Sequence, residues 1–239
     1  MQRPGKLLFG FFFFLSGLTH ALPDFGPVDM GEFYGSLPDV PASAKLGSLI
    51  KSEPIATTVS GAKAWKIAYV SSDVNGNKTI ATGIVVIPLS QSKAVKERPV
   101  MAWAHGTTGT AQTCGPSQVL NPAQPLNQYF MMNGNSWTDF GLPAMDAFIK
   151  AGYVIVATDY QGLGGGGKHQ YTVAATQAQD VINSIRAVIQ LKESKAANRA
   201  IVYGWSQGGG ATLAVAGMRD YLTVKDSIKC ALIFACFDI

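Results

Sequence analysis

Residues 200–210 read AIVYGWSQGGG, and this stretch decides the fold of the chain. Its first part, Ala200 to Tyr203, is a short apolar run that predicts a buried strand. From Gly208 to Tyr221 the sequence is rich in Ala and Gly and predicts a helix. Between them, residues 204–208 have the pattern GxSxG, which places a serine on a sharp turn from strand to helix. The stretch therefore predicts an α/β fold in which Ser206 is a candidate nucleophile.

Segments on both sides of this turn continue the alternation of strands and helices. The predicted elements are a hairpin from Ala64 to Ile87 that turns at Asn75-Gly76, a strand at Pro99–Ala104, a helix at Pro143–Ala151, a strand at Tyr153–Ala157, a helix at Thr172–Ser194 and a last strand at Ile228–Phe237. Strands that alternate with helices favour parallel pairing, because each helix returns the chain to the same edge of the sheet. We therefore expect a mostly parallel sheet with helices on both faces.

The N-terminal segment has the features of a secretion signal. Met1 to Ala21 contains Arg3 and Lys6, then an apolar run, then small residues that flank a cleavage site. An uncleaved membrane anchor is the alternative, although the apolar run is short for a membrane span. We expect a signal peptide at residues 1–21, an N-terminal arm at 22–62, an α/β core at 63–239, and a secreted or periplasmic protein.

Composition excludes several functional classes. Charged residues make up 14% of the 239 residues, against about 25% in an average soluble domain, and the net charge is only +4. Lys and Arg form no dense cluster, so nucleic acid is not an expected partner. Three histidines and three cysteines are scattered without metal-ligand spacing, so no metal is expected.

A glycine-rich run suggests a nucleotide site but lacks the rest of the motif. Gly162 to Gly167 has the pattern GxGxxG after a predicted strand. A dinucleotide fold also needs an acidic residue at the end of the next strand, whereas Asp180 falls inside a predicted helix. Lys168 is followed by His169 and not by Ser or Thr, so a P-loop is also disfavoured. No cofactor is therefore predicted.

A second loop supplies candidate groups for stabilising a negatively charged oxygen. The backbone N–H of Gln207, directly after the serine, is one expected donor. His105-Gly106-Thr107-Thr108-Gly109 follows the strand at Pro99–Ala104 and is the expected source of the other, through Thr107 or Thr108. His105 and Gly106 are expected to support this loop.

Over most of residues 45–236 the chain resembles the secretory lipases of the α/β-hydrolase superfamily. The matching stretches are Lys51–Pro54, Ala102–Gly109, Cys114–Ser117, Gly152–Gly162 and Gly204–Gly209. The resemblance implies that Ser206 is the nucleophile, that Gln207 and Thr108, with Thr107 as its alternative, form the oxyanion hole, and that Cys114 pairs with a cysteine farther downstream. Cys230 and Cys236 are candidate partners or simply buried hydrophobes.

The other members of a catalytic triad are missing from the expected positions. In this superfamily the acid and the histidine follow the serine, but no histidine follows Ser206 here. Of the later acids, Asp220 and Asp226 lie near the end of the predicted helix after Ser206, and Asp238 ends the last predicted strand, so none is placed as the triad acid should be. We therefore expect a truncated and inactive form of a hydrolase, cut after the strand that follows the nucleophile helix. His169 as an unconventional base is the alternative to a solvated loop histidine.

The predicted activity is hydrolysis of carboxylic esters through an acyl-enzyme. The resemblance favours lipid esters as substrates, with transient contact to a lipid surface. A peptidase or polyester hydrolase could share the same residues. A non-catalytic exported remnant or binding protein on the same scaffold is the alternative from another functional class.

Overall fold

The computed structural model describes residues 31–57, 59–89, 97–118, 145–218 and 229–236, the last of these ranges by its backbone only. The described strands are β1 (Leu49–Ile55), β2 (Ala62–Ser72), β3 (Lys78–Pro88), β4 (Arg98–Ala104), β5 (Val154–Thr158), β6 (Ala196–Trp205) and β7 (Lys229–Cys236). The helices are α1 (Glu32–Gly35), α2 (Met145–Lys150), α3 (Ala174–Gln190) and α4 (Gln207–Gly217), with short 3₁₀ turns at Gln112–Cys114, Pro116–Gln118 and Lys192–Ser194.

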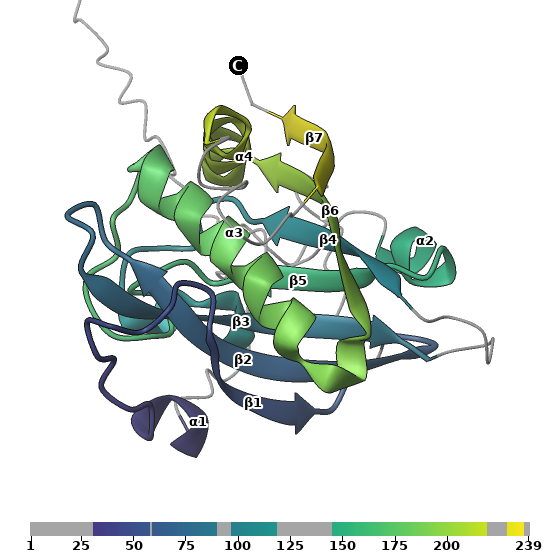
Figure 1. The fold of residues 1–239 in the computed structure, drawn as a ribbon, viewed down its shortest axis with the longest axis horizontal. Coiled ribbons are helices and arrows are strands. Elements are labelled where there is room, and N and C mark those ends of the chain that lie inside the picture. Colours follow the sequence, from purple (N-terminus) through teal and green to yellow (C-terminus); the bar gives the residue numbers. More distant parts are fainter. Residues whose placement is uncertain (1–30, 58, 90–96, 119–144, 219–228, 237–239) are drawn as a thin grey trace, which may run out of the picture.

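These strands form one mixed sheet in the order β1-β2-β3-β5-β4-β6-β7 (Figure 1). The half that carries the GxSxG turn is parallel, because β4 pairs in parallel with β5 and β6, and β6 pairs in parallel with β7. The other half is antiparallel and is built from the β2–β3 hairpin, with β1 on its outer side and β3 joined to β5. The carboxyl ends of β4, β5 and β6 therefore meet at one edge of the sheet.

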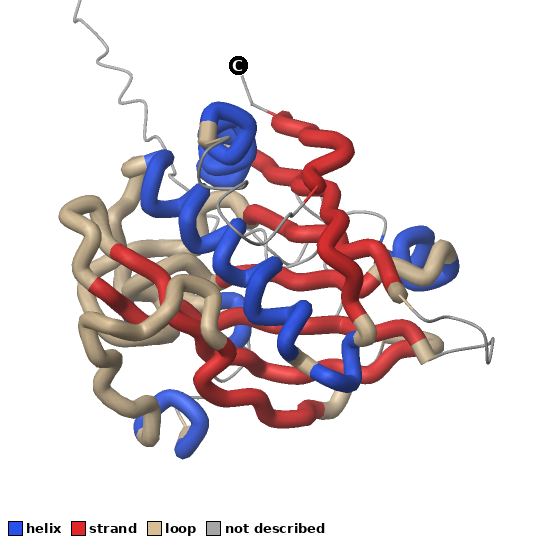
Figure 2. The backbone as a smooth tube through the Cα atoms, in the orientation of Figure 1, coloured by secondary structure: helices blue, strands red, loops and turns tan. Residues whose placement is uncertain are grey.

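Helices cover both faces of the sheet, as expected. On one face α3 and α4 pack on a cluster that includes Val100, Ala102 and Val202 (Figures 1 and 2). On the other face α2 packs on residues that alternate with these along the strands, such as Met101 and Trp103. Burial on both faces explains why residues 100–104 of β4 and 154–157 of β5 are all apolar.

The predicted elements are present with shifted ends. The long helix begins at Ala174 and ends at Gln190. It ends there because the chain tightens into the 3₁₀ turn at Lys192–Ser194, after which Lys195 adopts a left-handed conformation. The hairpin turns at Asn75-Gly76, where Asp73 accepts the backbone N–H groups of Asn75 and Asn77. Residues 1–30, which include the predicted signal peptide, lie outside the described part of the chain.

Strand β1 was not predicted from the sequence. Its residues, Leu49–Ile55, mix polar and apolar side chains and include Pro54. An edge strand tolerates this composition, because one side of its backbone needs no partner and one face remains in solvent. Upstream of β1, Phe33 of α1 is buried against Ala68 and Ile80, so the described part of the arm packs on the antiparallel half of the sheet.

The first turn of α4 approaches β4 so closely that only glycine fits. A Cβ on Gly208 would overlap the carbonyl oxygen of Ala104 and lie 2.7 Å from that of His105. A Cβ on Gly204 would overlap the Gly208 carbonyl oxygen in the same way. Gly210, two residues farther along the helix, has open space around it. The two outer glycines of the GxSxG pattern are therefore steric requirements of the strand-to-helix turn.

We expect Gly208→Ala to reduce the free energy of unfolding by about 2–3 kcal/mol, because backbone atoms of β4 cannot move away cheaply. The matched change Gly210→Ala should instead add about 0.5–1 kcal/mol through helix propensity alone. Urea denaturation of the two variants and the parent chain measures both effects. Equal stability of the two variants would show that the close approach is not a constraint.

Candidate active site

Ser206 lies at the turn between β6 and α4 in a strained backbone conformation. Its φ is 50° and its ψ is −117°, so this non-glycine residue has a positive φ. Such a conformation costs about 1–3 kcal/mol and persists only where the surroundings enforce it. Here Gly204 and Gly208 allow the tight packing that does so. The side chain is half-buried, and the residue caps the N-terminus of α4, where unpaired N–H groups and the helix dipole favour negative charge.

The loop after β4 begins directly beside this turn. Ala104, the last residue of β4, is paired in register with Gly204 of β6. Because the two strands are parallel, the segments 105–109 and 205–208 leave the sheet at the same edge. The close contact of Gly208 with the carbonyl groups of Ala104 and His105 fixes their separation. The structure thus brings the predicted nucleophile and the predicted oxyanion loop together.

The hydroxyl groups of both threonines in this loop are already engaged. Thr108 Oγ1 donates to the carbonyl oxygen of Cys114 at 2.8 Å. Thr107 Oγ1 lies 2.9 Å from the hydroxyl of the exposed Tyr171. These contacts hold the loop against the 3₁₀ turn at Gln112–Cys114 and against the segment after β5. Thr108 could therefore offer an oxyanion only its backbone N–H, whereas the Thr107 hydroxyl can donate elsewhere if it accepts from Tyr171.

His105 is buried beneath the loop and is 1% exposed. Its Nδ1 lies 2.5 Å from the carbonyl oxygen of Gly106, its Nε2 lies 3.3 Å from that of Asp159, and its ring stacks 4.4 Å from that of Tyr160. Burial lowers the pKa of His105 to about 4, although the two carbonyl contacts act in the opposite direction. The neutral imidazole has a single N–H, so it donates to one of these two carbonyl oxygens while its ring packs between the loops after β4 and β5.

Asp159 organises the end of β5, a role that sequence reasoning missed. Its carboxylate accepts hydrogen bonds from Thr82 Oγ1 at 2.6 Å, from the Ser117 N–H at 2.8 Å and from Ser117 Oγ. Burial raises the pKa of Asp159, and the bonds from Ser117 and Thr82 partly offset that effect. Ser117 Oγ also contacts Tyr34 OH at 2.7 Å, so this carboxylate connects β3, the Pro116–Gln118 turn and the arm.

Asp180 is a second buried carboxylate, and it lies within α3 as expected. It accepts the N–H of Gln161 at 2.8 Å and the hydroxyl of Ser71, so its oxygens are occupied by the protein itself. Burial raises its pKa to about 7. Gly164 and Gly165 of the glycine-rich run pack tightly on Thr82 and Ile80. The run therefore allows close packing on β3, and its geometry gives no support for a nucleotide site.

His169 lies in the same segment, and both of its ring nitrogens have partners other than Ser206. Nδ1 is 2.9 Å from the carbonyl oxygen of Gln161, and Nε2 is 3.3 Å from Nε2 of Gln207. This arrangement does not favour His169 as a base for Ser206. It does place His169 next to a residue of the GxSxG turn.

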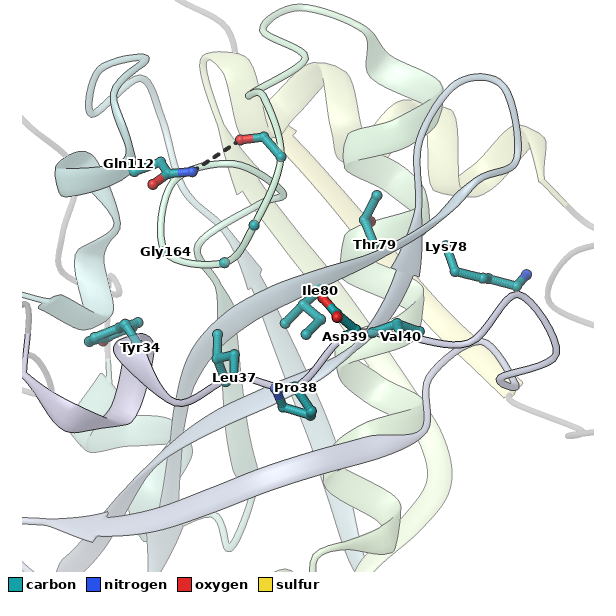
Figure 3. A pocket seen from close by; sticks show the side chains of 14 residues that line it. Tyr34, Leu37, Pro38, Asp39, Val40, Lys78, Thr79, Ile80, Gln112 and Gly164 are labelled. Atoms are coloured by element: carbon teal, nitrogen blue, oxygen red, sulfur yellow. Dashed lines mark hydrogen bonds between the residues drawn. The ribbon is translucent and has the colours of Figure 1, made fainter.

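A groove of about 560 Å³ lies between the arm and the glycine-rich run (Figure 3). It is lined by the arm from Tyr34 to Val40, by the start of β3 and by Gly164–Gly167, with Gln112 bonded to the Gly167 carbonyl at its rim. None of the predicted site residues lines it.

Two features are absent from the described ranges, a metal site and a membrane-spanning helix. No group of His, Cys, Asp and Glu side chains there could hold a metal ion. No described helix is long and apolar enough to cross a membrane. No described cysteine side chain pairs with Cys114, and the side chains of Cys230 and Cys236 lie outside the described part of the structure, so a disulfide of Cys114 stays a prediction.

The buried His105 predicts a pH-dependent stability. Its pKa of about 4 in the folded chain lies below the ordinary value of 6.5, so the unfolded chain binds more protons between these pH values. The stabilisation is complete above pH 6.5 and is lost as the pH falls towards 4. Between pH 7.5 and 5 the parent chain should lose about 2 kcal/mol of unfolding free energy more than His105→Gln does. Urea denaturation at both pH values measures this difference, in which the effects of Asp159 and Asp180 cancel. If the parent chain and His105→Gln lost the same unfolding free energy between pH 7.5 and 5, His105 would not be held neutral in the folded chain.

The chain is similar to known lipases and esterases in sequence and fold. Residues 135–221 match the family model for secretory lipase. Lipase 1 of Candida albicans is 26% identical to this chain over 75% of the chain, and Lipase 5 of the same organism is 22% identical over 70%. The chain spans only about a third of the length of these relatives (36% and 35%).

Solved structures show the same fold at lower identity. Candida antarctica lipase A in its closed state matches with a TM-score of 0.59 at 15% identity, over 89% of this chain and 44% of that one. The rice cell wall degrading esterase LipA of Xanthomonas oryzae, in a ligand-bound form, matches with a TM-score of 0.55 at 20% identity, over 79% and 49%. The resemblance to the secretory lipases and the α/β-hydrolase class of the fold are therefore confirmed.

Proposed function

We propose that the chain is the nucleophile-bearing portion of a secreted serine ester hydrolase that acts on lipid esters. The observation that carries the proposal is the strained conformation of Ser206 between β6 and α4, beside the loop after β4. A serine in that position presents its hydroxyl at the edge of the sheet, where a substrate carbonyl can approach. The similarity to lipases supports lipid esters as the substrate class.

In the proposed reaction Ser206 Oγ attacks the carbonyl carbon of the ester, the bond from that carbon to the alcohol oxygen breaks, and the alcohol leaves with the serine proton to give an acyl-enzyme. The N–H of Gln207, the first residue of α4, and a backbone N–H of Thr108, or of Thr107, stabilise the negative charge that develops on the carbonyl oxygen. His105 and Gly106 support the loop that carries the second donor. The edge that β4 and β6 share supports each of these proposed roles.

The proton of Ser206 needs an acceptor, and the described residues offer no histidine for it. His105 is enclosed between carbonyl groups, and His169 contacts Gln207 and Gln161. We therefore propose that this chain by itself turns esters over at least about 10⁴-fold more slowly than an enzyme with a complete triad. Within the same proposal, residues 1–21 act as a secretion signal, residues 22–62 form the arm, and residues 63–239 form the hydrolase core.

The assignment of Ser206 can be tested without turnover, by phosphonylation. The full chain is incubated with a p-nitrophenyl alkylphosphonate, and the modified residue is located by peptide mass spectrometry. We expect slow, stoichiometric labelling of Ser206, because strain and nearby N–H groups favour attack even without a base. Ser206→Ala should abolish the label, whereas Ser52→Ala, at an exposed serine of β1, should leave it unchanged.

Two outcomes would contradict these proposals. Labelling that persists in Ser206→Ala, or that is absent from the parent chain, would argue for a non-catalytic protein on the same scaffold. Steady ester turnover by the parent chain above about 1 s⁻¹, within the range of ordinary enzymes, would contradict its inactivity.

A further inference from the structure

His169 is the described histidine for which the proposed reaction has no use, yet the fold holds it firmly. It follows the glycine-rich run after β5, and its ring lies 6.2 Å from that of Tyr160 and 6.0 Å from that of Tyr171. Tyr171 in turn contacts Thr107 in the loop after β4. The imidazole therefore sits among the segments that surround Ser206, with a defined orientation.

The backbone determines which nitrogen of His169 carries the proton. Nδ1 lies 2.9 Å from the carbonyl oxygen of Gln161, and a carbonyl oxygen can only accept a hydrogen bond. Nδ1 must therefore be the N–H donor. Burial lowers the pKa of His169, which favours the neutral ring at pH 7 and leaves a lone pair on Nε2. This is the tautomer that the loop imposes.

That lone pair determines the orientation of the Gln207 side chain. Nε2 of His169 lies 3.3 Å from the side-chain nitrogen of Gln207, which donates to it. The reversed amide would place an oxygen against a lone pair. In the observed orientation Oε1 of Gln207 is buried and has no hydrogen-bond partner among the described residues. The contact with His169 is therefore the polar anchor of this side chain.

Gln207 is the residue whose backbone position matters most to the proposed reaction. It is the first residue of α4, so its N–H has no partner within the helix and can face a substrate oxygen. We propose that His169 is a positioning residue, which holds Gln207 by its side chain so that this N–H keeps its direction. The chain of contacts runs from the Gln161 carbonyl through the imidazole to the amide of Gln207. The significance of this direction for catalysis rests on the proposed function.

The tautomer and the anchor are tested together by nuclear magnetic resonance of the full chain with ¹⁵N-labelled histidine at pH 7.5. We expect His169 to show a protonated Nδ1 and an unprotonated Nε2, the minor tautomer of a free histidine side chain. Gln207→Met removes the donor to Nε2 and should shift the Nε2 resonance downfield. Gln112→Met is the matched control, since it removes a glutamine that also bonds to this segment, at the Gly167 carbonyl, and should leave the resonance in place. A protonated Nε2, or equal shifts in the two variants, overturns the proposal.

Two substitutions of His169 separate positioning of Gln207 from support of the loop. His169→Gln can place an amide oxygen where Nε2 was and still accept from Gln207. His169→Asn can place an amide nitrogen where Nδ1 was and retain only the bond to Gln161. The ¹⁵N order parameter of the Gln207 backbone amide should stay near about 0.85 in His169→Gln and fall below about 0.7 in His169→Asn. Equal values in the two variants overturn the positioning role. Neither readout requires ester turnover, so failure of the positioning role of His169 can be distinguished from failure of the proposed function.

Discussion

The contact between the first turn of α4 and the end of β4 is the constraint on which the site depends. Gly208 lies against the carbonyl groups of Ala104 and His105, where no side chain fits. That contact sets the distance between the strand-to-helix turn and the loop 105–109. It also enforces the positive φ of Ser206, because a relaxed turn would move α4 away from the sheet. Strain at one residue is thus maintained by close packing at its neighbours.

Buried polar groups extend this rigidity to the loop after β5. Asp159 connects that loop to β3 and to the arm, and Asp180 fixes Gln161 from α3. His105 joins it to the loop after β4. A loop without regular structure needs such bonds, because its backbone groups are not satisfied by a ladder or a helix. Burying these two carboxylates costs free energy, as the raised pKa values of Asp159 and Asp180 indicate. In return, their hydrogen bonds hold the loop after β5 in one conformation.

Much of this architecture could be predicted from local sequence patterns. The GxSxG turn, the β2–β3 hairpin and helix α3 have strong signals in glycine placement and apolar periodicity. Strand β1 has no such signal, because its pairing with β2 compensates for a mixed composition that includes Pro54. The antiparallel pairing of β3 with β5 likewise has no local signal, because it joins two strands that are separated in the sequence by β4. The engagement of both threonine hydroxyls by Cys114 and Tyr171 requires contacts between segments that are separate in the sequence.

The role of Ser206 is tested most sharply by a crystal structure of the full chain after reaction with an alkylphosphonate. We expect a covalent bond from phosphorus to Ser206 Oγ, with one phosphonyl oxygen about 2.7–3.1 Å from the backbone nitrogens of Gln207 and of Thr108 or Thr107. A phosphonyl oxygen that points to solvent, or a phosphonate bound to another residue, would contradict it.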